Sequence, residues 1–183
     1  MALTSTYRRQ LRERALDQYG YVTTQDAKEL GVPPVELRKL HQRGGLEHVG
    51  HGLYRFDDIP HTGHDQFMEA VLRVGPDAFL VGDAVLALHN LALANPRRIR
   101  VASPHRERHR LPEFLEVERR DIPPTERTYY EGIPSMTVGR ALLDCRGFMM
   151  DERLIEATHE AAKAGLLRRG EVQHVLEALG ETV

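Results

Sequence analysis

Apolar positions in the first third of the chain follow helical spacing, and three helices are predicted there. The first covers residues 6–19, with apolar side chains recurring on one face. The second begins at Thr24, whose side-chain oxygen can accept an unpaired backbone N–H of the first turn, and it ends before Gly31. The third covers residues 34–43, because Pro34 suits a first helical turn, where a missing N–H costs little.

The third predicted helix has two unlike faces. At about 100° per residue, Leu37 and Leu40 share a face that can pack on the other helices. The opposite face carries a small apolar group, two cations and an amide: Val35, Arg38, Lys39 and Gln42. Such groups can meet thymine methyls, guanine and adenine edges and phosphates in a DNA major groove.

A β-hairpin is predicted directly after this helix. Residues 46–49 and 53–56 are short β-prone runs around Gly50, His51 and Gly52, and glycines supply the positive φ of a tight turn. Helix, turn, helix and hairpin in this order predict a winged helix-turn-helix over residues 1–58. The residues that we expect to contact DNA are Thr24, Val35, Arg38, Lys39, Gln42, Arg43 and His51.

The rest of the chain, residues 59–183, is predicted to be a second domain of the α+β class. Helical spacing recurs over 65–74, 83–91, 138–146, 151–163 and 169–179, and alternation over 98–102, 114–119, 128–130 and 133–136. We expect a small, mainly antiparallel sheet flanked by helices. The acidic, proline-containing stretch 57–62 predicts a linker that few contacts cross.

Composition narrows the class of protein. Of the 183 residues, 41% are hydrophobic and 28% charged, which predicts a folded protein. The single cysteine, Cys145, excludes an internal disulfide and a cysteine-rich zinc site, and its apolar neighbours predict a buried thiol. Neither a membrane-length apolar run nor the apolar core of a signal peptide occurs, so we expect a cytoplasmic protein without membrane contact.

The positive charge is concentrated in the first domain. The net charge is −2, but residues 1–56 hold nine Lys or Arg against six Asp or Glu, a net +3. Residues 57–183 hold 16 against 21, a net −5. Phosphate affinity per monomer is therefore expected to be modest, and a dimer on DNA would double the contacts.

A second basic segment lies within the predicted sheet. It consists of Arg97, Arg98, Arg100, Arg106, Arg108 and Arg110. Two interpretations stay open: a second surface for nucleic acid or an acidic partner, or a solvated loop between two strands.

Catalytic and metal-binding patterns are weak. His61 and His64 have a metal-ligand spacing, but no third ligand is evident. A metal-dependent nuclease would need an acidic residue followed by a Glu-x-Lys strand, and the nearest candidate, Glu116 with Glu118, lacks the lysine. We therefore predict no catalytic site, no metal and no cofactor, and a protein that is not an enzyme.

The chain resembles the AbiEi family of abortive-infection antitoxins, which are predicted transcriptional regulators with an N-terminal winged helix. The N-terminal residues that carry the resemblance are Thr24, Ala27, Gly31, Leu37, Leu40, Gly44, Leu46, Gly52 and Tyr54. Later in the chain, the runs GDAVLALH at 82–89 and GIPSMTVGRALLD at 132–144 carry it, together with the strand at 99–101.

The resemblance implies a type IV-like antitoxin that binds double-stranded DNA at the operator of its own operon and represses it. It further implies that the C-terminal domain opposes a nucleotidyltransferase-like toxin, directly or functionally. A ligand-sensing winged-helix repressor is the main alternative, and a metal-dependent nuclease a weaker one.

Overall fold

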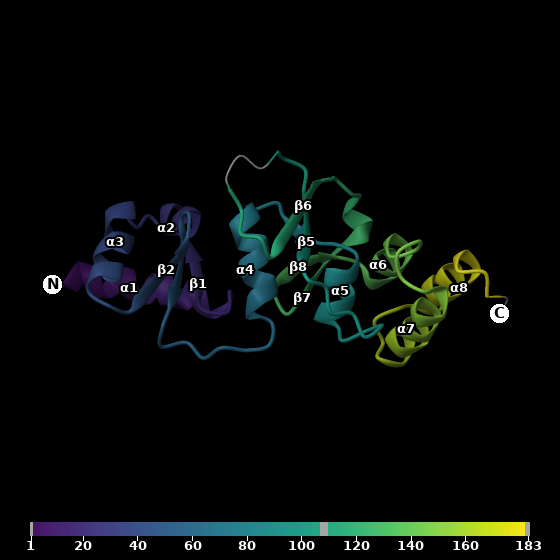
Figure 1. Ribbon diagram of the computed structural model, residues 1–183. Helices are drawn as coiled ribbons and strands as arrows, with labels where there is room; N and C mark the ends of the chain where they lie inside the picture. The colour runs from purple at the N-terminus through teal and green to yellow at the C-terminus, as the bar shows by residue number, and fades with distance from the viewer. Residues whose placement is uncertain (1, 107–109, 182–183) are drawn as a thin grey trace. The chain divides into compact units, whose positions relative to one another are not determined.

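The computed structural model describes residues 2–106 and 110–181 and has an α+β fold (Figure 1). Contacts divide the chain into two compact units, Met1–Arg73 and Val74–Val183. Helix α4 (Asp65–Val74) is thereby grouped, up to Arg73, with the N-terminal unit. The functional division between residues 58 and 59 stays a prediction.

The N-terminal unit has the predicted order of elements. Its helices are α1 (Ala2–Leu16), α2 (Thr24–Glu29), α3 (Pro34–Gln42) and α4, and its strands are β1 (Tyr21–Thr23), β2 (Leu46–Gly50) and β3 (Leu53–Phe56). The strands form an antiparallel sheet in the order β1-β3-β2, with Val22 opposite Tyr54. The hairpin predicted after α3 is therefore confirmed.

Apolar side chains from the first three helices and from all three strands form the core of this unit. The most buried members are Leu11, Ala15, Val22, Ala27, Leu37 and Phe56, each with 0% of its surface exposed. Fully burying one such large side chain contributes about 1.5–3 kcal/mol. The core fixes α3 against α1 and the sheet, so the opposite face of α3 is left to solvent.

The cap of α2 lies one residue earlier than predicted. Thr23, not Thr24, is the N-cap: its backbone is extended, and its Oγ1 accepts a hydrogen bond from the Asp26 N–H at 3.0 Å. The Thr24 N–H instead donates to the Gly52 carbonyl at 2.8 Å. Thr24 does not cap α2, because it is already the first residue of the helix and follows the extended Thr23.

Asp26 connects polar groups of α1 and of the N-cap of α2. Its side chain is buried and accepts hydrogen bonds from the Thr23 N–H at 2.8 Å and from the Gln18 amide at 3.1 Å. It also pairs with Arg14 at 3.0 Å. One carboxylate thus joins the end of α1 to the start of α2.

The stretch expected to be a linker is packed on the N-terminal unit. Ile59 is 8% exposed and belongs to the core, and Asp58 pairs with Arg12 at 3.0 Å. Arg55, one of the nine cations of residues 1–56, is buried. Its guanidinium donates to the Ile59 carbonyl at 2.9 Å and to the Asp65 carboxylate at 3.2 Å. Acidic residues and a proline thus surround an isoleucine that is buried in the N-terminal unit.

The C-terminal unit is built on a five-stranded sheet in the order β6-β5-β4-β8-β7 (Figure 1). Its strands are β4 (Phe79–Leu80), β5 (Ile99–Ser103), β6 (Leu115–Arg119), β7 (Arg127–Tyr130) and β8 (Ile133–Met136). Its helices are α5 (Asp83–Leu88), the short 3-10 helix η1 (Pro124–Glu126), α6 (Val138–Asp144), α7 (Asp151–Lys163) and α8 (Arg169–Ala178). Among the described residues, no helix combines the length and apolarity needed to cross a bilayer.

The sheet is mixed, which corrects the prediction of a mainly antiparallel one. The pairs β4–β5 and β7–β8 are antiparallel, but β5–β6 and β4–β8 are parallel. Alternation of side chains has the same period in both directions, so it does not report strand direction. Parallel neighbours need a connection of roughly a dozen residues, and residues 104–114 supply it between β5 and β6.

The buried Arg55–Asp65 pair gives a first prediction about stability. Burial alone raises the pKa of Asp65, but hydrogen bonds from Thr62 and His61 and the charge of Arg55 outweigh it and lower that pKa below its ordinary value of 3.8. A lowered pKa stabilises the fold above the ordinary value, and this contribution is lost as the pH falls. Asp65→Asn should lower the free energy of unfolding by about 3–5 kcal/mol near neutral pH, since Arg55 is left buried and unpaired.

Chemical denaturation between pH 7 and pH 3 measures this difference, which should shrink toward the acidic end. Asp58→Asn is the control, because it removes an ion pair whose carboxylate is 43% exposed and should change stability by about 0–1 kcal/mol. Equal losses from the two substitutions would contradict the structural role given to Asp65.

Candidate nucleic-acid interface

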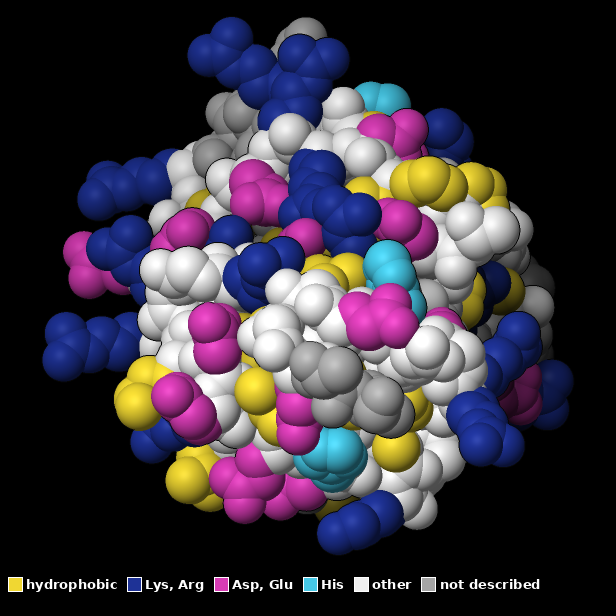
Figure 2. Space-filling model, turned by 90° about the vertical axis from the view of Figure 1, so that its right-hand side faces the viewer, with side chains coloured by type: hydrophobic (Ala, Val, Ile, Leu, Met, Phe, Trp, Pro, Cys, Tyr) yellow, Lys and Arg dark blue, Asp and Glu magenta, His cyan; other side chains and the backbone are white. Residues whose placement is uncertain are grey.

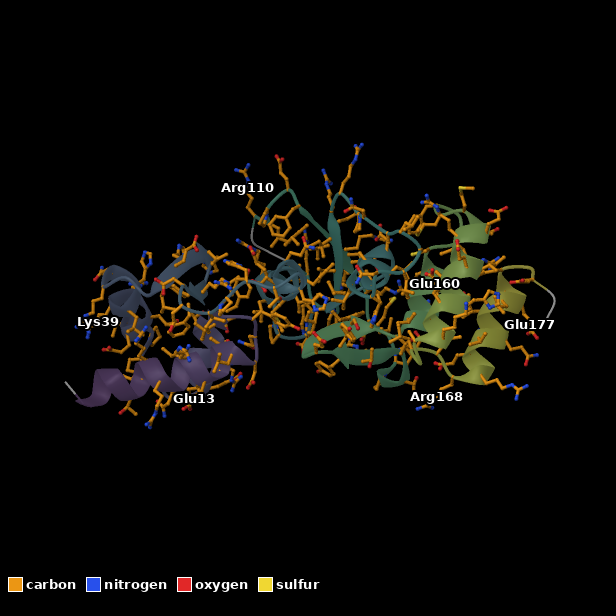
Figure 3. All side chains as sticks on the ribbon, turned by 90° about the horizontal axis from the view of Figure 1, so that it is seen from below. Glu13, Lys39, Arg110, Glu160, Arg168 and Glu177 are labelled. Atoms are coloured by element: carbon orange, nitrogen blue, oxygen red, sulfur yellow. The ribbon has the colours of Figure 1, made fainter. Side chains whose placement is uncertain are left out.

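Helix α3 presents the predicted polar face to solvent. Leu37 and Leu40 are buried in the core, whereas Val35 is 50% exposed and Arg38 and Gln42 are exposed. Figure 3 shows Lys39 at the outside of the N-terminal unit. The residues expected to read DNA therefore share one accessible helix face.

The two cations of this face differ in their surroundings. The Lys39 ammonium lies 2.8 Å from Oε1 of Glu36, whose other carboxylate oxygen is buried without a hydrogen-bond partner. Over the part of the chain that the structure describes, the Arg38 guanidinium has no ion-pair partner. Lys39 is thus held along the surface of α3, and Arg38 is free to reach a groove. Sequence spacing did not single out Glu36.

The hairpin is joined to the end of α3 and to α2. The His41 ring nitrogen Nδ1 lies 2.8 Å from the carbonyl oxygen of Leu46, the first residue of β2. The hairpin turn holds exposed His51, beside the bond between Thr24 and Gly52 described above. Arg43 is exposed at the end of α3. The predicted DNA contacts therefore come from α3, the residue that follows it, the start of α2 and the hairpin turn.

The basic segment of the C-terminal unit is divided by its own strand. Exposed Arg97 and Arg98 precede β5, and exposed Arg106 and Arg110 follow it. Within β5, Arg100 pairs with the carboxylates of Glu116 and Glu118 of β6. Arg108 lies outside the described residues. The exposed arginines of the described residues therefore precede or follow β5, and Figure 3 shows Arg110 pointing away from the ribbon.

The strand considered for nuclease chemistry is neutralised by arginines. Arg100 lies 3.7 Å from Glu116 and 3.3 Å from Glu118, and Arg120 bridges Glu118 and Asp144. Among the residues that the structure describes, no three His, Cys, Asp or Glu side chains gather as metal ligands. His61, considered above as a metal ligand, lies 2.7 Å from the Asp65 carboxylate instead.

A cavity in the C-terminal unit bears on the ligand-sensing alternative. It has a volume of about 400 Å³ and is lined by Asp77, His105, Asp121 and Arg127 together with prolines and an isoleucine. Its charged groups pair with one another: His105 lies 3.2 Å from Asp77, and Arg127 lies 2.7 Å from Asp121. On the face drawn in Figure 2, side chains of both charges are likewise interspersed.

Comparison with known proteins finds a family match in the N-terminal part of the chain. Residues 9–56 match the model of a family described as "Transcriptional regulator, AbiEi antitoxin". Over these residues the resemblance to the AbiEi family that the sequence indicated is confirmed, and the later residues lie outside the match. No curated protein matches the chain.

Among solved structures, the chain is similar to the crystal structure of the RV2827C protein from Mycobacterium tuberculosis. The two share 17% sequence identity with a TM-score of 0.46, over 96% of this chain and 78% of that chain. Similarity at this level supports no argument about function.

The buried thiol gives a second prediction. Cys145 is 0% exposed, and burial raises its pKa to about 12. Because the thiolate is the reactive form, a disulfide reagent at pH 8 should label the native protein at least roughly 100-fold more slowly than a free thiol. Labelling should become complete in denaturant. Rapid labelling of the native protein would show that Cys145 is an accessible nucleophile.

Proposed function

We propose that the N-terminal unit is a winged helix-turn-helix that binds double-stranded DNA and represses transcription. In this proposal α3 is the recognition helix and the β2–β3 hairpin is the wing. The observation that carries it is the exposed row Val35, Arg38, Lys39 and Gln42 on α3, opposite the buried Leu37 and Leu40. A helix of this kind places its side chains in a major groove, and the wing then contacts the adjacent backbone.

The target that we propose is the operator of the protein's own operon. The family description of residues 9–56 supports regulation and an antitoxin role. The full proposal is an autorepressor that opposes a nucleotidyltransferase-like toxin and performs no catalysis of its own. Few free cations lie on α3, so two copies on one operator would supply the phosphate contacts that one copy lacks.

Arg38→Ala tests the reading face. A bidentate contact from arginine to guanine contributes about 1–3 kcal/mol of discrimination, so affinity for the bound duplex should fall about tenfold or more at fixed salt. Fluorescence anisotropy with short duplexes tiling the DNA upstream of the gene measures this change.

Arg9→Ala is the matched control, because Arg9 is an exposed arginine of α1 that lies 3.9 Å from Glu13. It should change affinity far less than Arg38→Ala at the same salt concentration. A folded Arg38→Ala protein with unchanged affinity would remove Arg38 from the DNA-reading surface, and absence of any bound duplex would overturn the proposed function.

The antitoxin role generates a separate prediction in the full chain. If the loop between β5 and β6 contacts an acidic partner, reversing the charge of Arg106, Arg108 and Arg110 to Glu should abolish protection against a co-expressed nucleotidyltransferase-like toxin. Operator affinity should stay within about twofold, because the substituted residues lie outside the N-terminal unit that holds the proposed DNA contacts. Growth rescue and anisotropy measure the two effects. Full protection by the charge-reversed protein would exclude this loop as the partner surface.

A further inference from the structure

A chain of hydrogen bonds runs from the small sheet through α4 to the hairpin that we propose as the wing. The Tyr21 hydroxyl donates to Oε2 of Glu69 at 3.0 Å. The Arg73 Nε–H donates to Oε1 of the same carboxylate at 2.7 Å. Arg73 Nη2 then donates to the Val49 carbonyl at 2.7 Å. The bond from Tyr21 orients the Glu69 carboxylate, and this carboxylate in turn orients the Arg73 guanidinium.

These groups are shielded from solvent. Tyr21 is 3% exposed, and the side chains of Arg73 and Glu69 are 15% and 19% exposed. Burial and the Glu69 carboxylate raise the pKa of Tyr21 well above its ordinary range, so its hydroxyl remains a donor. A charge-assisted bond in such surroundings is stronger than one between solvated groups.

The bond to Val49 is made where the hairpin ladder is irregular. His48 pairs with Tyr54 and Gly50 pairs with Leu53, so Val49 is the extra residue of a β-bulge. A bulge leaves its extra residue outside the ladder and bends the strand. Arg73 donates a hydrogen bond to the carbonyl of this extra residue, Val49. The bend of the strand at Val49 sets the direction of the hairpin tip.

Gly50 leaves the space that the guanidinium occupies. A Cβ built on Gly50 would overlap Nη1 of Arg73, whereas the φ of Gly50 lies outside the left-handed region. Alanine is therefore compatible with the Gly50 backbone and conflicts only with the Arg73 side chain. Gly50 of β2 and Arg73 of α4 are therefore sterically complementary.

We propose that Arg73, held by Glu69 and Tyr21, is a positioning residue that fixes the wing at its Val49 bulge for contact with DNA. This inference rests on the proposed function and adds a residue outside the stretch 9–56. Arg73 touches no DNA in this account. It acts by holding the hairpin, from the last residue of the N-terminal unit.

A double-mutant cycle in the full-length protein tests this proposal with Gly50→Ala, Arg73→Ala and the double substitution. Each single substitution removes the same bond, since alanine at position 50 displaces the guanidinium. Amide hydrogen exchange at His51 and Gly52 should become roughly tenfold faster in each, and affinity for the bound duplex about tenfold weaker. The double variant should be no worse than the more affected single variant, because the shared bond can be lost only once.

Gly63→Ala is the control, since Gly63 has open space around it and no left-handed φ. It should leave exchange and affinity as in the wild type. Additive losses in the double variant, or wild-type exchange of the hairpin amides in Arg73→Ala, would overturn the proposal. Faster exchange with unchanged DNA affinity would show that Arg73 holds the hairpin without serving DNA contact, which also overturns it.

The two proposals fail in distinguishable ways. If the wild-type protein binds no duplex, the proposed function fails, while exchange of the hairpin amides still reports whether Arg73 holds the hairpin. If Arg38→Ala weakens binding and Arg73→Ala does not, DNA binding stands and the positioning role of Arg73 is excluded.

Discussion

The buried ion pair between Arg55 and Asp65 is the constraint on which the N-terminal unit depends. Arg55 lies on β3, and its guanidinium also donates to the carbonyls of Phe56 and Ile59. A buried pair adds little net stability compared with an apolar substitute, but loss of one partner is costly. Its effect here is therefore to specify geometry: it places the first turn of α4 beside the sheet. From that point, the helix carries Glu69 and Arg73 to the hairpin.

The arginines of this unit divide into two groups by what they contact. Arg14 and Arg55 bind buried carboxylates, and Arg73 binds a carboxylate and a backbone carbonyl. Arg38 and Arg43 are exposed on α3 or directly after it. Arg12 and Arg55 pair with Asp58 and Asp65, two acids that lie beyond residue 56. The net charge of +3 counted over residues 1–56 therefore overstates the charge that can meet phosphate.

Much of the fold was predictable because local patterns determine it. Helical periodicity placed α4 at 65–74 and α7 at 151–163, as the structure has them. The cap of α2 was misplaced because two adjacent threonines offer the same side chain, and the reciprocal bonds between Thr23 and Asp26 separate them. The sheet directions and the packed stretch at Ile59 depend on contacts distant in sequence, which periodicity does not contain. For the same reason the contact of Arg73 with the hairpin could not be predicted, because in the sequence Arg73 looks like any cation near a helix C-terminus.

A recognition helix with few free cations changes what the wing must contribute. Nonspecific affinity for DNA grows with the number of phosphates neutralised, and Lys39 is already paired with Glu36. Under the proposed function, Arg38 and Gln42 discriminate between base pairs. They can do so only if the rest of the N-terminal unit holds α3 at a fixed position on the duplex. Backbone contacts from the hairpin can do so only if its tip has a fixed direction. The bonds from Thr24 and Arg73 to the hairpin meet that requirement from two sides.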